Sequence, residues 1–108
     1  MRYTKGITRQ HTYMLNLYIK TYCPYSVRVL EANTVIQAPL TIFDTYVFPE
    51  LKNELVTKGG KKQVPFLEDT DREVSMYESL DIIDYLKAHY GNGTEVNVKV
   101  VGNVCPID

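Results

Sequence analysis

The feature that most constrains the fold of this chain is a predicted strand that runs into a cysteine followed by a proline. Residues 13–20 are mostly apolar, as is typical of a strand, and Pro24 stands where the first turn of a helix tolerates a missing N–H. Cys23 is therefore expected at a strand-to-helix corner, facing unpaired N–H groups and the positive end of the helix dipole. That environment favours the thiolate, and Lys20 adds a cation near the sulfur. A cysteine that only packs in a core would not require a proline and a helix start beside it.

Composition and charge limit the class of protein. With 108 residues, of which 44% are hydrophobic, the chain is expected to form one domain with a single modest core. A net charge of −1 gives no global field that would attract nucleic acid or an anionic membrane. No apolar run approaches the roughly 20 residues of a membrane span, and the first residues lack the apolar core of a signal peptide.

The cysteine pattern bears on the compartment. Cys23 and Cys105 lie far apart in the sequence, which is neither a disulfide framework nor a zinc-ligand spacing. With His11 and His89 as the only histidines, no metal site is expected. We therefore expect a reducing compartment, and hence a cytoplasmic protein. Cys105 either resolves the active-site thiol or is a spare thiol, and we expect a spare thiol because the sequence offers no geometry for the other role.

The rest of the pattern alternates helices and strands between a flexible arm, residues 1–12, and a tail, residues 91–108. Helices are predicted at 24–35, 49–58 and 78–90, and further strands at 40–45, 64–68 and 73–76. Their expected inward-facing side chains are Val27, Leu30, Thr34, Leu51, Leu55, Leu80, Ile82, Ile83 and Leu86. The first strand, helix and strand predict a parallel pair, and the last two strands a hairpin, within a domain at 13–90. The alternating run at 95–101 either adds an edge strand or stays mobile.

Three stretches of the domain carry a resemblance to a known family. Tyr-Ile-Lys-Thr-Tyr-Cys-Pro-Tyr-Ser at 18–26, Gly-Gly-Lys-Lys-Gln-Val-Pro-Phe-Leu at 59–67 and Met-Tyr-Glu-Ser-Leu-Asp-Ile-Ile-Asp-Tyr-Leu at 76–86 resemble a glutaredoxin. The last stretch is also similar to the N-terminal domain of glutathione transferases. The resemblance implies an α/β thioredoxin-like fold with a four-stranded mixed sheet and three helices. It also implies glutathione as co-substrate, and thiol–disulfide exchange in electron transport.

The resemblance assigns the chemistry to Cys23, Pro24, Tyr25 and Ser26. The family's commonest motif has a second cysteine where this chain has Ser26, so no disulfide can close within the motif and a one-cysteine cycle is expected. In that cycle Cys23 takes glutathione from a protein–glutathione mixed disulfide, and a second glutathione releases glutathione disulfide. Full-length glutathione transferases carry a helical second domain, whereas residues 91–108 are all that follows here, so conjugation of a bulky electrophile is not expected.

The resemblance also implies a glutathione site. A cis peptide before Pro65 would expose the Val64 backbone to the cysteinyl part of glutathione; the alternative is a trans proline that opens an edge strand. The γ-glutamyl end would meet an acidic and a hydroxyl side chain at a helix start. The implied glutathione-binding residues are Lys20, Tyr25, Gln63, Val64, Pro65, Glu78 and Ser79. Ser75 and Glu78 also fit a capping box, so a purely structural role for Glu78 stays open.

The expected partners are glutathione and glutathionylated proteins, bound by a monomer, with no nucleic acid or membrane. Two other functions stay open. An iron–sulfur cluster carrier would hold its cluster between two chains through Cys23 and glutathione, although the family's dedicated carriers use glycine where this chain has Pro24 and Tyr25. A glutathione-binding module derived from a transferase N-terminal domain would turn nothing over.

Overall fold

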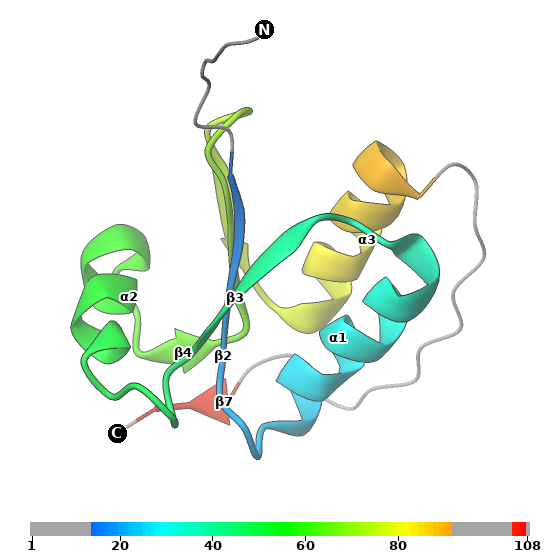
Figure 1. Ribbon diagram of the computed structural model, residues 1–108. Helices are drawn as coiled ribbons and strands as arrows, with labels where there is room; N and C mark the ends of the chain where they lie inside the picture. The colour runs from blue at the N-terminus through cyan, green and yellow to red at the C-terminus, as the bar shows by residue number, and fades with distance from the viewer. Residues whose placement is uncertain (1–13, 92–104, 108) are drawn as a thin grey trace, which may run out of the picture.

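The computed structural model describes residues 14–91 and 105–107, in which strands and helices alternate (Figure 1). The elements are β2 (Leu15–Ile19), α1 (Pro24–Ile36), β3 (Leu40–Asp44), α2 (Leu51–Gly59), β4 (Gln63–Val64), β5 (Phe66–Asp69), β6 (Val74–Tyr77), α3 (Ser79–Tyr90) and β7 (Cys105–Pro106). A 4-stranded sheet has the order β3-β2-β5-β6, in which β2 is parallel to β3 and antiparallel to β5, and β5 is antiparallel to β6. This confirms the mixed sheet expected from the sequence. β4 and β7 form a separate 2-stranded pair.

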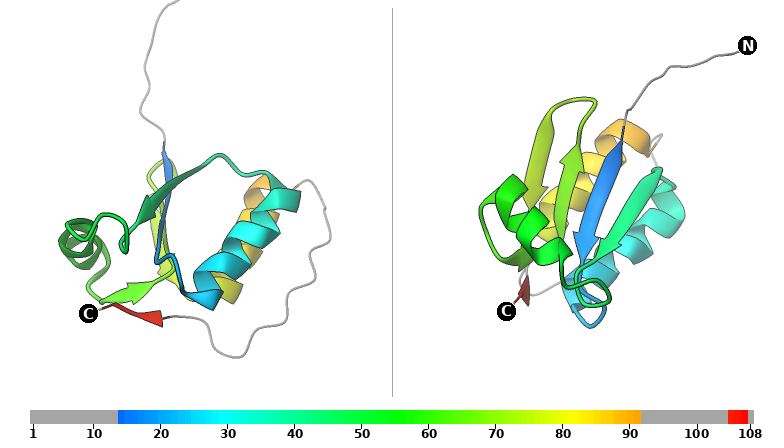
Figure 2. Two further views of the ribbon diagram at one scale, coloured as in Figure 1. Left: turned by 60° about the horizontal axis from the view of Figure 1, so that its bottom comes forward. Right: turned by 60° about the vertical axis from the view of Figure 1, so that its left-hand side comes forward.

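The central strand β2 separates two buried clusters of side chains. Leu15, Leu17 and Ile19 join the larger core, which contains the inner residues of α1 and α3. Tyr18 belongs to a second cluster, together with Leu55 of α2. Figure 2 shows the same layers, with α1 and α3 on one face of the sheet and α2 on the other. In the part of the chain that the structure describes, no helix has the length and apolar character needed to cross a membrane.

The predicted inner faces of α1 and α3 are wrong at three positions. Val27 is 37% exposed, Leu80 is 39% exposed, and Thr34 is also exposed. α1 instead buries Ser26, Val29, Ala32 and Ile36, and α3 buries Ser79, Ile82, Ile83 and Leu86. The reason is that the two helices pack against each other as well as against the sheet, which turns each buried stripe away from a face chosen for the sheet alone.

Some element boundaries also differ from the prediction. The expected strand at 64–68 is divided at Pro65 into β4 and β5, because proline has no N–H to donate to a ladder. Helix α2 begins at Leu51 and ends at the predicted glycine pair, where Gly60 has a φ of 87° that glycine adopts without steric cost. The arm at 1–12 and the alternating run at 95–101 lie outside the described residues.

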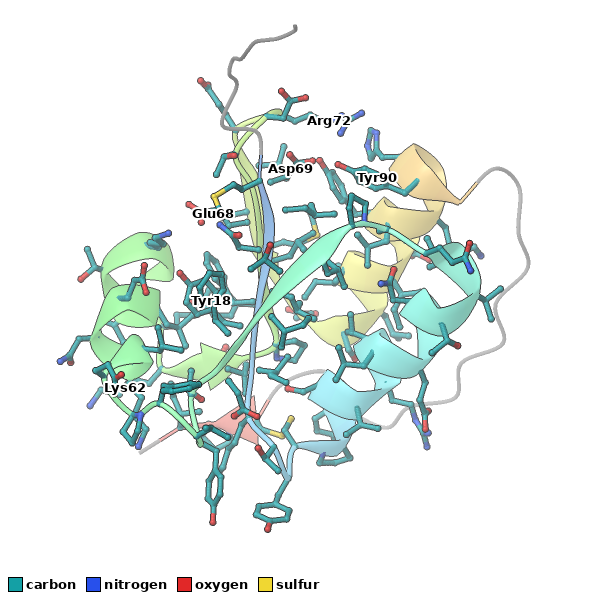
Figure 3. All side chains as sticks on the ribbon, viewed as in Figure 1. Tyr18, Lys62, Glu68, Asp69, Arg72 and Tyr90 are labelled. Atoms are coloured by element: carbon teal, nitrogen blue, oxygen red, sulfur yellow. A yellow bond between two sulfur atoms is a disulfide. The ribbon has the colours of Figure 1, made fainter. Side chains whose placement is uncertain are left out.

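A buried carboxylate fixes the end of the sheet at the β5–β6 turn. Asp69 is fully buried and accepts hydrogen bonds from the Tyr85 hydroxyl at 2.6 Å, the Tyr90 hydroxyl at 3.2 Å and Arg72 Nη1 at 3.2 Å. It also accepts the backbone N–H groups of Asp71 and Arg72 in the turn. Figure 3 shows Asp69, Arg72 and Tyr90 gathered at this end of the molecule. The cluster thus joins the hairpin to the last turn of α3.

Asp69→Asn is expected to lower the free energy of unfolding by about 2 kcal/mol, because each hydrogen bond to a charged group contributes more than a neutral one. Burial by itself would raise the pKa of Asp69, but the bonds from Tyr85 and Arg72 outweigh it and lower the pKa below its ordinary value of 3.8. The stabilisation is therefore complete above that value and is lost as the pH falls through the folded-state pKa. Urea denaturation of both proteins from pH 7 to pH 3 measures this. A difference between parent and variant that stays constant over the series would contradict it.

Candidate active site

A row of aromatic side chains crosses the sheet at the end where the site forms. Tyr18 in β2 is in register with Phe43 in β3 and with Phe66 in β5, and Phe66 is in register with Tyr77 in β6. Successive ring centroids are 5.0, 5.8 and 4.7 Å apart. This row aligns the points at which three strands enter or leave the sheet. Cys23 follows β2, Val64 precedes β5, and Glu78 follows β6, so the register brings their backbones to one end of the sheet.

Cys23 lies at the strand-to-helix corner that the sequence predicts. It is the N-cap of α1, with Pro24 at the first helical position, and its sulfur accepts the Ser26 N–H at 3.4 Å. The Cys23 N–H donates to the Lys20 carbonyl at 2.9 Å, which closes the turn between strand and helix. A helix N-terminus of this kind stabilises a thiolate through both its N–H groups and its dipole. Cys23 is 1% exposed in this arrangement.

Ser26 occupies the position where the glutaredoxin motif most often has its second cysteine. It is fully buried, and its hydroxyl oxygen accepts the backbone N–H of Lys20 at 3.4 Å. The side chain therefore holds the loop before Cys23 against the first turn of α1. Tyr25, the residue before Ser26 in the motif, is half-buried and packs against the cluster that contains Tyr18 and Val64.

The expectation that Cys105 is a spare thiol is wrong, because its sulfur is bonded to that of Cys23 (Figure 3). The Cα atoms of the two residues are 6.1 Å apart, although 82 positions separate them in the sequence. Sequence spacing alone cannot show such a pairing, since the contact depends on where the tail returns to the fold. The signals that the sequence did hold were a motif without a second cysteine and one other cysteine elsewhere in the chain.

Residues 105–107 are held beside Cys23 by pairing with the backbone at Val64. β7 runs antiparallel to β4, with Cys105 opposite Val64 and Pro106 opposite Gln63. The Ile107 N–H then donates to the Lys62 carbonyl at 2.9 Å, and the Ile107 side chain is 2% exposed. The peptide bond between Val64 and Pro65 is cis, as the resemblance implies. The backbone edge that was expected to bind an extended cysteine peptide thus carries one in this structure, supplied by the chain itself.

The capping-box interpretation of Ser75 and Glu78 is wrong. Ser75 belongs to β6, and Glu78 is itself the N-cap of α3 with no side-chain capping bond. Glu78 is exposed and has a φ of 80°, which non-glycine residues rarely adopt, whereas Ser79 beside it is fully buried. Strained positions of this kind concentrate at ligand-binding sites, so the conformation favours a functional role for Glu78 over a structural one.

Lys20 lines a cavity beside the tail. The cavity has a volume of about 350 Å³ and its lining residues are Lys20, Thr45, Tyr46, Pro49, Lys52 and Ile107. Two lysines and one tyrosine among the lining residues suit an anionic group that continues from a peptide bound at Val64. Sequence reasoning placed Lys20 here through the resemblance but missed Lys52 and Ile107. Gln63 lies at the edge of β4, where its backbone is paired with Pro106.

Comparison with known proteins identifies the family. Residues 17–94 match the family described as Glutathione S-transferase, N-terminal domain. The chain belongs to this family. A comparison with curated proteins finds no match. The thioredoxin-like fold expected from the sequence is thereby confirmed, together with its similarity to the transferase domain.

Solved structures agree with the assignment. A glutathione S-transferase, unclassified 2, from Bombyx mori has a TM-score of 0.64 and 27% identity, covering 73% of this chain and 37% of its own. An epsilon-class glutathione S-transferase from the housefly Musca domestica has a TM-score of 0.61 and 25% identity, covering 72% and 36%. A glutathione transferase homolog from Drosophila mojavensis, solved with bound glutathione, has a TM-score of 0.63 and 24% identity, covering 75% and 37%. The chain therefore spans little more than a third of the length of these proteins.

After full reduction, Cys23 is expected to react with iodoacetamide at pH 7 roughly tenfold faster than a free cysteine, because the helix N-terminus favours its thiolate. Cys105 provides an internal comparison, since it lies in no helix. Peptide mapping after partial alkylation measures both rates in one sample. If Cys23 reacts no faster than Cys105, the corner does not activate the thiol.

Proposed function

We propose that this domain is a glutathione-dependent thiol–disulfide oxidoreductase of the glutaredoxin type, which reduces protein–glutathione mixed disulfides at Cys23. The observation that carries the proposal is the position of Cys105, whose backbone pairs with Val64 while its sulfur is bonded to Cys23. A cysteine within an extended peptide therefore fits this site in the geometry of disulfide exchange. Glutathione is a short peptide with a cysteine at its centre, so its cysteinyl part can use the same backbone groups.

The reaction at Cys23 consists of two exchanges. The Cys23 thiolate attacks the glutathione sulfur of the mixed disulfide, a new bond forms between these two sulfurs, and the protein thiolate leaves and takes up a proton. The thiolate of a second glutathione then attacks the glutathione sulfur held on Cys23, which releases glutathione disulfide and restores the Cys23 thiolate. The Ser26 N–H and the α1 dipole stabilise the Cys23 sulfur whenever it is the attacking or the leaving thiolate.

The residues around Cys23 divide the recognition of glutathione among them. Val64 and the cis Pro65 present the backbone edge for the cysteinyl part, and Gln63 with Lys20 extends it toward the glycine carboxylate. Glu78 and Ser79, at the start of α3, would meet the ammonium and carboxylate of the γ-glutamyl end. Tyr25 packs on the same cluster as Val64.

A second candidate is a glutathione-binding module that turns nothing over, and the match to a transferase N-terminal domain favours it. The two functions differ only in the chemistry of Cys23. Glutathione-dependent reduction of a small mixed disulfide separates them, because a pure binding module would show affinity for glutathione without turnover.

Cys23→Ser is expected to reduce turnover in that assay to the background rate, since the serine hydroxyl is no nucleophile for a disulfide at neutral pH. Cys105→Ser is the comparison variant for the second thiol and should keep most of the turnover, because external glutathione can attack the adduct on Cys23 without Cys105. The rate of glutathione disulfide formation measures both. Turnover that survives in Cys23→Ser would contradict the proposed function.

Glu78→Gln is expected to raise the glutathione KM severalfold, because loss of a charged hydrogen bond costs on the order of 1.5 to 3 kcal/mol at most. The melting temperature should hardly move, since the side chain makes no capping bond to the helix. Steady-state kinetics and thermal unfolding test the two halves of this prediction. Parent-like KM values would remove Glu78 from the glutathione site.

A further inference from the structure

We propose that Cys105 is the resolving thiol of this oxidoreductase, and that residues 105–107 are a tethered peptide that competes with glutathione for Val64. The inference rests on the proposed function of Cys23. The motif itself offers no second thiol, because the position is taken by Ser26, which is fully buried and accepts the Lys20 N–H. A second sulfur supplied by the chain itself can therefore come only from outside the motif, and the structure places that of Cys105 on Cys23.

Residues 105–107 are seated by more than the disulfide. Cys105 and Pro106 pair with β4 as an antiparallel strand, and the Ile107 N–H bonds the Lys62 carbonyl at 2.9 Å. The Ile107 side chain is buried in the cluster that includes Tyr18 and Phe66. A strand pairing, an additional backbone bond and a buried apolar side chain together position the sulfur. Residues 105–107 therefore occupy a peptide-binding site, and the disulfide is not their only attachment to the fold.

The same contacts make the tail and glutathione mutually exclusive. In the proposed function the cysteinyl part of glutathione pairs with the Val64 backbone, and in this structure Cys105 stands opposite Val64. Only one extended peptide can use that edge at a time. The oxidised chain therefore has no free cysteinyl subsite, and reduction of the disulfide restores it. Cys105 acts as an intramolecular counterpart of the cysteine of glutathione.

The resolving step and the return to the reduced chain need no reagent other than glutathione. After Cys23 has taken glutathione from a mixed disulfide, the Cys105 thiolate attacks the Cys23 sulfur, the bond to glutathione breaks, and the glutathione thiolate leaves and takes up a proton. The chain is now oxidised by two electrons as the Cys23 to Cys105 disulfide. A glutathione thiolate then attacks Cys105 and expels the Cys23 thiolate. A second glutathione attacks the glutathione sulfur on Cys105, which releases glutathione disulfide and restores both thiols.

Exposure and leaving-group stability both direct the incoming glutathione to Cys105. Cys23 is 1% exposed, whereas Cys105 is only partly buried. Attack on Cys105 also expels the thiolate that lies at the helix N-terminus and accepts the Ser26 N–H, which is the better leaving group. A disulfide that forms and breaks during turnover is compatible with the proposed cytoplasmic location, because catalytic disulfides occur there although structural ones are rare.

The test is a redox titration of the full chain in glutathione buffers, with acid-quenched species counted by intact mass. An internal disulfide forms with release of two glutathiones, so its population depends on total buffer concentration as well as on the ratio of reduced to oxidised glutathione. Diluting the buffer about tenfold at a fixed ratio should therefore raise the oxidised-to-reduced ratio of the parent about tenfold. Cys105→Ser should instead carry one glutathione on Cys23, in a proportion that dilution does not change.

Parent protein that holds a glutathione adduct insensitive to dilution would overturn the proposal, and so would parent protein that forms neither species. This result is independent of the proposed function, which is measured by reduction of a mixed disulfide. A chain that forms the dilution-sensitive disulfide but reduces no mixed disulfide would leave Cys105 as the redox partner of Cys23 and remove the glutaredoxin activity. Turnover without the internal disulfide would keep the glutaredoxin activity and remove Cys105 as the redox partner of Cys23.

A second variant tests the seating of the tail while keeping both cysteines. Ile107→Ala removes the buried side chain that anchors residues 105–107, and should lower the equilibrium constant for the internal disulfide by at least about tenfold. Val35→Ala on α1 is the matched control, because Val35 is 49% exposed and lies outside both clusters, and it should leave the constant unchanged. Equal constants in Ile107→Ala and the parent would show that the tail is not a docked peptide, which would overturn the competition with glutathione.

Discussion

The structure depends on the burial of the central strand β2 on both of its faces. All five of its residues are buried; Leu15, Leu17 and Ile19 join one cluster, and Tyr18, on the opposite face, joins the other. Leu17 and its neighbours on the same face hold α1 and α3, whereas Tyr18 holds α2 and the returning tail. Because strand side chains alternate with a period of two, a slip of one residue would exchange the two faces and disrupt both clusters. The register of β2 is therefore strongly specified, and so is the position of the Cys23 corner that follows it.

The aromatic row extends the register of β2 to the candidate active site. Tyr18, Phe66 and Tyr77 stand side by side on three neighbouring strands, and the Tyr77 hydroxyl donates to the Lys61 carbonyl at 2.9 Å and accepts the Lys61 N–H at 3.1 Å. That pair of bonds ties the end of β6 to the segment between α2 and β4. The row also leaves little space beside it, since a Cβ at Gly59 would lie 2.8 Å from the Phe66 ring. The residues proposed to recognise glutathione are thus placed by strands that are themselves fixed by ring packing.

The order of elements and the Cys23 corner could be predicted from the sequence, because both depend on local chemistry. Proline at a helix start, alternation in a strand and glycine after a helix each act within a few residues. The exposed positions of Val27 and Leu80 could not be predicted, because they depend on how two helices share one face of the sheet. The partner of Cys23 could not be predicted either. Nothing local to Cys105 specifies that the chain returns there, and the contact exists only in the assembled fold.

The backbone edge of β4 explains why this site binds an extended peptide. Val64 is fully buried, and its backbone groups face the edge that β7 occupies. Backbone groups that are buried without partners cost free energy comparable to a lost hydrogen bond, so such an edge favours any extended segment that can complete the pairing. A cysteine opposite Val64 gains a second contribution, since its sulfur can also meet the thiolate at the start of α1. The same two groups would therefore select the tail and glutathione alike, and the choice between them would follow the supply of reduced glutathione.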